Sequence, residues 1–221
     1  MKQAFYLFIL ALTTACAKER LTIQGNLAGL ADGAVYLRVY DGVRVRTVDS
    51  TLSTGGRFTF GLPQILPEII FIQVEDNDLF FIPIVIEQRN LQIRGDVNSP
   101  ESITVEGSQG NADMQAYRVL VRHNEMKLHT ILSHLNNASP TGDQAGYKTL
   151  VHKRDSLEGL IEGQRRQFIA EYPASIVSAY LSLTRVTDST SRGEVIQLLW
   201  ELDRTDMEDN IYLNRLLKAT E

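Results

Sequence analysis

The sequence of 221 residues contains only one cysteine. A single cysteine cannot form an internal disulfide, a CxxC redox pair or a zinc site built on several thiolates. Basic residues are also not in excess, because 22 Lys and Arg residues are balanced by 27 Asp and Glu residues. This balance argues against a nucleic-acid-binding protein, which needs a concentrated basic surface. Hydrophobic residues make up 43% of the chain, which is enough to build the core of one large or two small domains.

No apolar run in the sequence reaches the roughly 20 residues that cross a bilayer. The run at 4–12 contains nine apolar or aromatic residues and follows the positive charge of Lys2. Its length and flanking charge are typical of a secretory signal peptide, and we therefore expect residues 1–15 to form one.

The segment LTTAC at residues 12–16 resembles a bacterial lipobox, in which the signal peptide is cut before a cysteine that then carries lipid. The resemblance implies lipidation of Cys16 and a tether at 16–20, although Thr13 occupies the place where lipoboxes usually have leucine. The alternative is an ordinary signal peptide beside an incidental cysteine. Ala17 rather than aspartate follows the cysteine, so the familiar inner-membrane retention signal is missing. We expect a cell-envelope protein, anchored through lipid at the outer membrane on its periplasmic or surface face.

Residues 21–108 alternate short β-type runs with turn residues, at the spacing expected of an all-β sandwich. The predicted strands are residues 21–27, 34–40, 43–52, 57–62, 68–75, 79–87, 91–95 and 102–106. Pro83 cannot donate a hydrogen bond to a neighbouring strand, so its strand should lie at a sheet edge or carry a bulge. We predict an antiparallel β-sandwich of about eight strands.

Residues 109–221 change to a helical period. Asn111 is placed to cap a first helix, and apolar residues follow it at helical spacing as far as Leu135. The other predicted elements are a linker at 136–146 and helices at 150–168, 174–186, 193–203 and 206–219. The predicted fold class is therefore α+β, a β-sandwich followed by a C-terminal helical region.

A hairpin is predicted at residues 40–42. A three-residue loop there pairs Val39 with Val43 and Leu37 with Val45, which keeps the apolar alternation of both strands. A two-residue turn would instead place arginines on the apolar face.

This register sets Arg38 opposite Arg44, and Arg46 opposite Tyr36, on the other face of the hairpin. Like charges directly opposite one another are destabilising. The four residues therefore form a candidate patch for an anion or an acidic partner. The alternative is a solvated face whose charge is neutralised by nearby acids.

Residues that could support catalysis or metal binding occur only in patterns with structural explanations. Histidines on one helix bind a metal at spacings of three or four, whereas the first three histidines here are six and five residues apart. The four histidines are His123, His129, His134 and His152. Nucleophile motifs such as GxSxG and SxxK are missing. The acids Glu75, Asp76 and Asp78 fit a turn. We predict a protein that is not an enzyme and that binds no metal or cofactor.

The predicted helices carry adaptable apolar side chains of the kind found at protein interfaces. These residues are Met114, Met126, Met207, Trp200, Tyr212, Leu216 and Leu217. The alternative is that they form core, or pack against the β domain.

Residues 20–108 resemble the family known as domain of unknown function 4369. The shared motifs are IxGxxxGLxDG at 23–33, YDG at 40–42, DS at 49–50, GxFxF at 56–60 and TVxGS at 104–108. The family is typical of lipoproteins from Bacteroides-type bacteria, where it precedes a thioredoxin-like disulfide-reductase domain. The resemblance implies the sandwich architecture, lipid anchoring and an envelope location.

The reductase chemistry of such relatives is not expected here. It needs one thiolate to attack a disulfide and a second thiol to resolve the intermediate, and this sequence has no WCxxC and no second cysteine. We expect a non-catalytic binding or assembly module, with an envelope protein as a candidate partner. The alternatives are a docking partner for a separate thioredoxin-like reductase, and a sugar- or nutrient-binding component of the outer membrane. The sequence predicts no oligomeric state.

Overall fold

The computed structural model describes residues 20–40, 44–63, 67–74, 81–138, 143–187, 189–205 and 209–220. Several residues used in the sequence predictions lie outside these ranges, namely residues 1–19 with Cys16, Asp41, Gly42, Val43, Glu75, Asp76, Asp78 and Met207.

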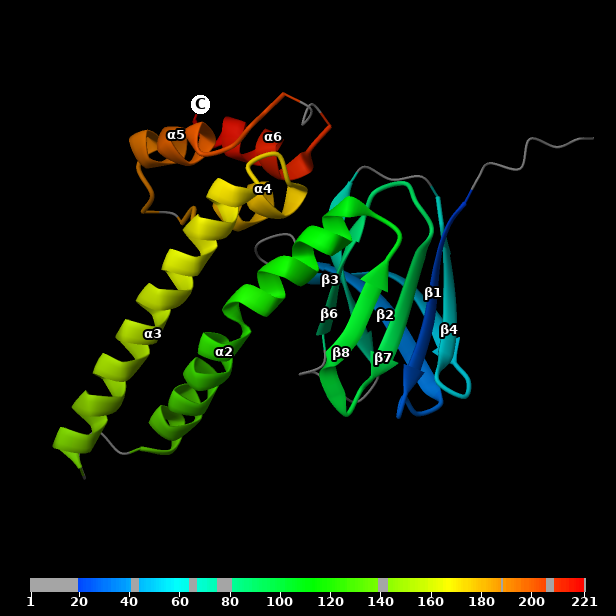
Figure 1. Cartoon of the computed structure of the whole chain (residues 1–221), viewed down its shortest axis with the longest axis horizontal. Coiled ribbons are helices and arrows are strands. Elements are labelled where there is room, and N and C mark those ends of the chain that lie inside the picture. The colour runs from blue at the N-terminus through cyan, green and yellow to red at the C-terminus, as the bar shows by residue number, and fades with distance from the viewer. Residues whose placement is uncertain are drawn as a thin grey trace, which may run out of the picture.

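Within the described residues, the N-terminal part forms eight strands in two four-stranded sheets (Figure 1). The first sheet has the order β4-β1-β7-β8 and consists of β1 (Leu21–Ala28), β4 (Arg57–Leu62), β7 (Leu91–Asp96) and β8 (Ser99–Glu106). The second has the order β3-β2-β5-β6 and consists of β2 (Gly33–Tyr40), β3 (Val45–Ser53), β5 (Glu68–Val74) and β6 (Phe81–Ile86). These sheets, followed by helices, confirm the predicted α+β class with its N-terminal sandwich.

Alternating side chains build the core between the sheets. Along β4, Phe58 and Phe60 are buried while Arg57 and Thr59 are exposed, because successive side chains of a strand point to opposite faces. The buried faces of both sheets meet in one hydrophobic cluster. The two phenylalanine rings pack edge to face in it, 5.8 Å apart.

The strand directions differ from the prediction at one place. β1 and β7 are parallel, with Ile23 paired to Leu91, so the sandwich is not purely antiparallel. These strands are distant in sequence, and no hairpin forces them into opposite directions. Pro83 lies on β6, which ends its sheet among the described strands, so the predicted edge position is confirmed.

Helices occupy the C-terminal part: α2 (Gln109–Asn137), α3 (Gln144–Glu171), α4 (Ile176–Leu183), α5 (Arg192–Trp200) and α6 (Ile211–Lys218). The predicted linker at 136–146 is shorter than expected because Asp143 caps α3, accepting a hydrogen bond from the Gly146 N–H at 2.9 Å. Figure 1 shows α2 and α3 running side by side away from the sandwich, with α4, α5 and α6 grouped at the other end of α3.

The predicted cap of the first helix was wrong. Ser108 caps α2, and Asn111 lies in the first turn. The side chain of Asn111 is needed elsewhere, because its Oδ1 accepts from the Val85 N–H at 2.9 Å and its Nδ2 donates to the Val85 carbonyl at 2.7 Å. The amide therefore bonds β6 as a neighbouring strand would.

Tyr212 of α6 makes a similar contact with β5. Its hydroxyl accepts from the Ile69 N–H at 2.6 Å and donates to the Ile69 carbonyl at 3.4 Å. Ile69 and Val85 face each other across β5 and β6 and belong to the same hydrophobic cluster as the helices. The helical region is thus fixed to the second sheet by a shared core and by two side chains that bond one cross-strand pair.

Candidate functional site

The outer half of the α2–α3 pair lacks a core. We call this part the arm, residues 122–138 and 143–160, and none of its described side chains is buried. At the base of the arm, by contrast, Val121 is only 1% exposed and Ile161 only 7%. Two helices alone bury only the seam between them, and helices in proteins owe most of their stability to packing of an apolar face. The arm therefore has apolar surface that a further element could cover.

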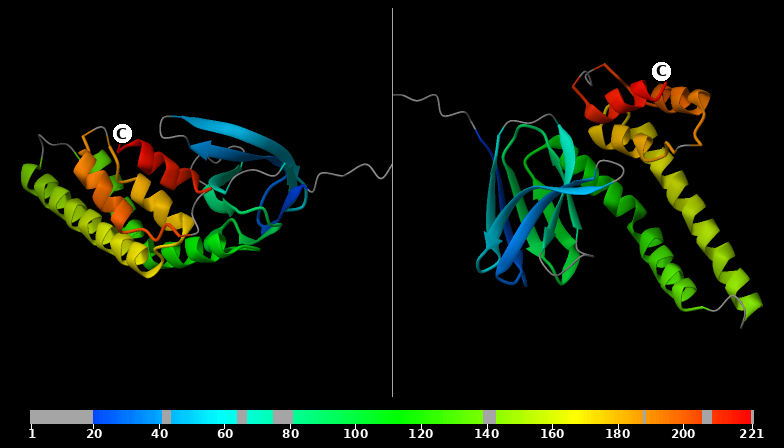
Figure 2. Two further views of the ribbon diagram at one scale, coloured as in Figure 1. Left: turned by 90° about the horizontal axis from the view of Figure 1, so that it is seen from above. Right: turned by 180° about the vertical axis from the view of Figure 1, so that it is seen from behind.

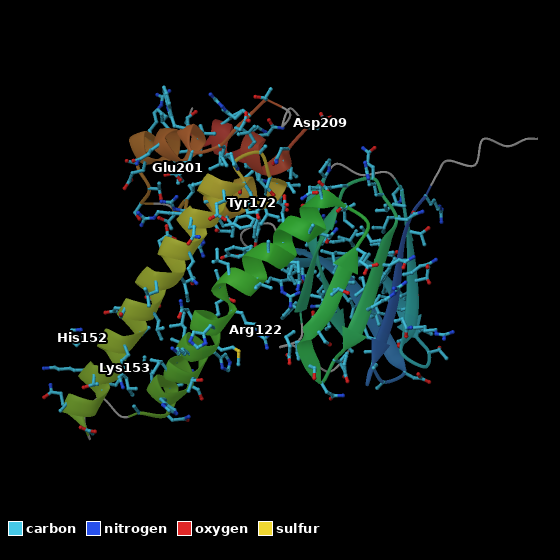
Figure 3. The ribbon with its side chains drawn as sticks, in the orientation of Figure 1. Arg122, His152, Lys153, Tyr172, Glu201 and Asp209 are labelled. Atoms are coloured by element: carbon cyan, nitrogen blue, oxygen red, sulfur yellow. The ribbon has the colours of Figure 1, made fainter. Side chains whose placement is uncertain are left out.

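A groove of about 620 Å³ lies between the two helices of the arm. Its lining residues are Lys127, Thr130, Ile131, Thr149, His152, Lys153, Ser156 and Leu157. The apolar floor comes from Ile131 and Leu157, and the three hydroxyl residues are small. Figure 3 labels His152 and Lys153 on α3, towards the free end of the arm. Nearer the base, the Gln164 side chain bridges the helices, donating to the Leu120 carbonyl at 2.6 Å and accepting from Asn124 at 3.0 Å.

Charge is unevenly distributed around the arm. The ionisable residues that line the groove are Lys127, His152 and Lys153, and none of the lining residues is acidic. Neither lysine makes an ion pair with a described residue. Arg154, which follows Lys153 on α3, does pair with Asp155 at 2.6 Å. Two residues along a helix turn the side chain by about 200°, so Asp155 and Glu125 lie on the far side of their helices from the groove lysines. The groove side is therefore cationic and the opposite side is mixed.

All four histidines lie on the arm, and each is exposed. Only His152 contributes to the groove lining. In the part of the chain that the structure describes, no group of three or more His, Cys, Asp or Glu residues is placed to hold a metal ion.

The predicted arginine patch is not assembled as expected. The structure pairs Arg38 with Thr47 rather than with Arg44, and Arg46 with Val39 rather than with Tyr36. Two features change the register. The pair Tyr40–Val45 makes the hairpin connection four residues long rather than three. A bulge between Leu37 and Arg38 then leaves one extra residue in β3.

This register separates the members of the patch. Tyr36 and Arg38 share one face of β2, with the guanidinium 5.2 Å from the centre of the tyrosine ring. Arg46 points to the opposite face, where its charge acts on Glu68. Burial raises the pKa of Glu68 above its ordinary value of 4.5, and the nearby positive charges of Arg215 and Arg46 oppose this rise. Arg44 lies just before β3 and is exposed.

The apolar side chains considered for an interface fall into two groups. Met114, Tyr212 and Leu216 are buried in the core, so they hold the helices together. Met126 on the arm is 60% exposed and Trp200 at the end of α5 is 83% exposed. Of the groove residues the sequence singled out only His152, as one of four histidines weighed for metal binding, because the groove depends on which faces of two separate helices meet.

None of the helices in the described part of the chain is long and apolar enough to cross a membrane.

Residues 21–114 match the family model described as Domain of unknown function (DUF4369), the family that these residues were predicted to resemble. The match spans the sandwich and the first turns of α2, and it leaves the arm outside. The family description assigns no function. The comparison with curated proteins found no match, and the comparison with solved structures found none either.

Proposed function

We propose that this chain, with its DUF4369 sandwich, is a non-catalytic, lipid-anchored protein of the cell envelope that binds a partner protein through the arm. The observation that carries the proposal is the lack of a buried side chain anywhere in the described arm. Each Å² of apolar surface that is buried stabilises the fold by about 25 cal/mol, and such burial is what stabilises most helices in proteins. A partner that covers the groove would supply this burial.

The position of the arm suits such a role. β1 begins on the side of the sandwich that lies away from α3, as the views of Figure 2 show. A lipid on Cys16 would reach β1 through only a few residues, so the membrane would lie near that side of the sandwich. The arm would then project away from the anchor and be accessible to another protein.

The chemistry of the groove supports binding rather than catalysis. A hydroxyl nucleophile needs a base within hydrogen-bond reach. His152 makes no hydrogen bond with Thr149, Ser156 or any other residue that the structure describes. No carboxylate lines the groove to orient this imidazole.

Site-specific photo-crosslinking in cells that produce the protein tests the binding role. A photoreactive residue at Thr130 in the groove should capture a discrete protein, whereas the same residue at Thr59 on the exposed face of β4 should not. Capture of the same set of abundant proteins from both positions, or of none from Thr130, would refute it. A thioredoxin-like reductase among the specific products would identify the chain as its docking partner.

The anchor is tested separately. Cys16→Ser should abolish metabolic labelling with a fatty acid and move the protein from the membrane fraction to the soluble fraction. Retention of both label and membrane association would refute lipidation at this residue.

A further inference from the structure

We infer that the groove of the arm receives an acidic amphipathic helix of the partner protein, which completes a three-helix bundle with α2 and α3. This inference rests on the proposed function and adds the chemical nature of the partner.

The dimensions of the arm match a helix. Residues 122–137 of α2 extend about 24 Å at 1.5 Å per residue, and the facing part of α3 is of similar length. Packed helices lie 8–10 Å apart, with closer approach where the side chains between them are small. The groove is lined by three short hydroxyl side chains, those of Thr130, Thr149 and Ser156, which permit a close approach. Its apolar stripe consists of Ile131 and Leu157. A helix with apolar residues at every third or fourth position fits this stripe.

The positive charge of the groove predicts which residues flank the apolar stripe of the partner helix. Lys127 and Lys153 make no ion pair with any described residue, and the lining has no acid to neutralise them. Glutamate or aspartate beside the apolar stripe of the partner would pair with these lysines, as flanking charges do in coiled coils.

The charge of the groove disfavours one other occupant, and the position of the arm disfavours another. A second copy docked groove to groove would bring Lys127 and Lys153 of both chains together, and the repulsion between like charges would destabilise this complex. An anionic membrane surface would have to reach the arm, which projects from the side of the sandwich away from the start of β1 (Figures 1 and 2). A helix of a separate protein meets neither difficulty.

Fluorescence anisotropy with two synthetic peptides tests the inference on the soluble Cys16→Ser chain. Each peptide has about 18 residues, with leucine at helical spacing, and the flanking positions are glutamate in one and lysine in the other. The glutamate peptide should bind and the lysine peptide should not. Lys127→Glu combined with Lys153→Glu should lower the binding affinity for the glutamate peptide by at least about tenfold, which corresponds to 1.4 kcal/mol. The same double variant should bind the lysine peptide.

A matched control carries the same change of net charge outside the groove. Lys148→Glu combined with Arg57→Glu replaces two exposed cations that do not line it, and this variant should retain the affinity of the unmodified chain. Circular dichroism of both variants checks that their helix content is unchanged.

Three results would overturn the inference: equal binding of the two peptides, binding of neither, or equal effects of the groove and control variants. Light scattering that shows a dimer abolished by the groove variant would assign the groove to a second copy. Sedimentation with phosphatidylglycerol vesicles that depends on the same lysines would assign it to a membrane. In any of these cases, a specific crosslink from Thr130 to another protein would leave the proposed binding function standing without its acidic helix.

Discussion

Tyr212→Phe removes one hydroxyl from the contact between α6 and the second sheet. The ring stays in place, so no large cavity forms and only the hydrogen bonds change. The Ile69 N–H, which donates to this hydroxyl at 2.6 Å, loses its partner in a buried position. Leaving one buried donor unsatisfied costs about 1–3 kcal/mol. The second bond, to the Ile69 carbonyl at 3.4 Å, is long and adds little. We expect the free energy of unfolding to fall by about 2 kcal/mol.

Urea denaturation followed by circular dichroism measures this loss, and hydrogen exchange should show faster exchange of the Ile69 amide. Tyr180→Phe is the matched control. Its ring packs against Tyr212 with centroids 5.2 Å apart, but its hydroxyl makes no hydrogen bond with any described residue. This control should change stability by less than about 0.5 kcal/mol. Similar losses for the two variants, or a negligible loss for Tyr212→Phe, would show that the hydroxyl does not satisfy Ile69.

Two further substitutions test the junction and its electrostatics. Asn111→Ala leaves both the N–H and the carbonyl of Val85 without their partner, so thermal or urea unfolding should show a loss of about 2–5 kcal/mol. Asn137→Ala, at an exposed helix end, should lose less than about 0.5 kcal/mol, and equal losses would contradict this account. Burial raises the pKa of Glu68, so its contribution to stability is present below about pH 4.5 and is lost as the pH rises through the raised pKa. Glu68→Gln should therefore lose less stability than the unmodified chain between pH 4 and pH 7, and an unchanged pH profile would count against the burial effect.

The strands could be predicted well where one residue in two is apolar. β4 was predicted at 57–62 and is observed at Arg57–Leu62, because its alternation is regular. The pairing of the strands was harder to predict from the sequence. The parallel contact between β1 and β7 has no local signal, and the register of β2 and β3 depends on a bulge that the side-chain pattern does not mark.

The candidate site was harder to predict for a related reason. The helical period located α2 and α3. A groove, however, forms where faces of two helices meet, and a stripe such as Leu128 and Leu135 looks the same in sequence whether a third helix covers it or not. In the structure both leucines are half-buried, and Leu128 packs against the buried core of the helical region whereas Leu135 lies outside that cluster. The contact of Asn111 with β6 joins residues 26 positions apart, so no local pattern distinguishes this asparagine from a helix cap.

The bond between Asn111 and Val85 also limits how other chains can approach the second sheet. Along a strand, alternate residues direct their N–H groups to the same side, so Phe81, Pro83 and Val85 share the free edge of β6. Proline has no N–H, and the Val85 N–H is already bonded to Asn111. An incoming strand would find only one donor among the described residues of this edge, too few for a ladder of main-chain hydrogen bonds. The edge therefore resists aggregation by strand addition.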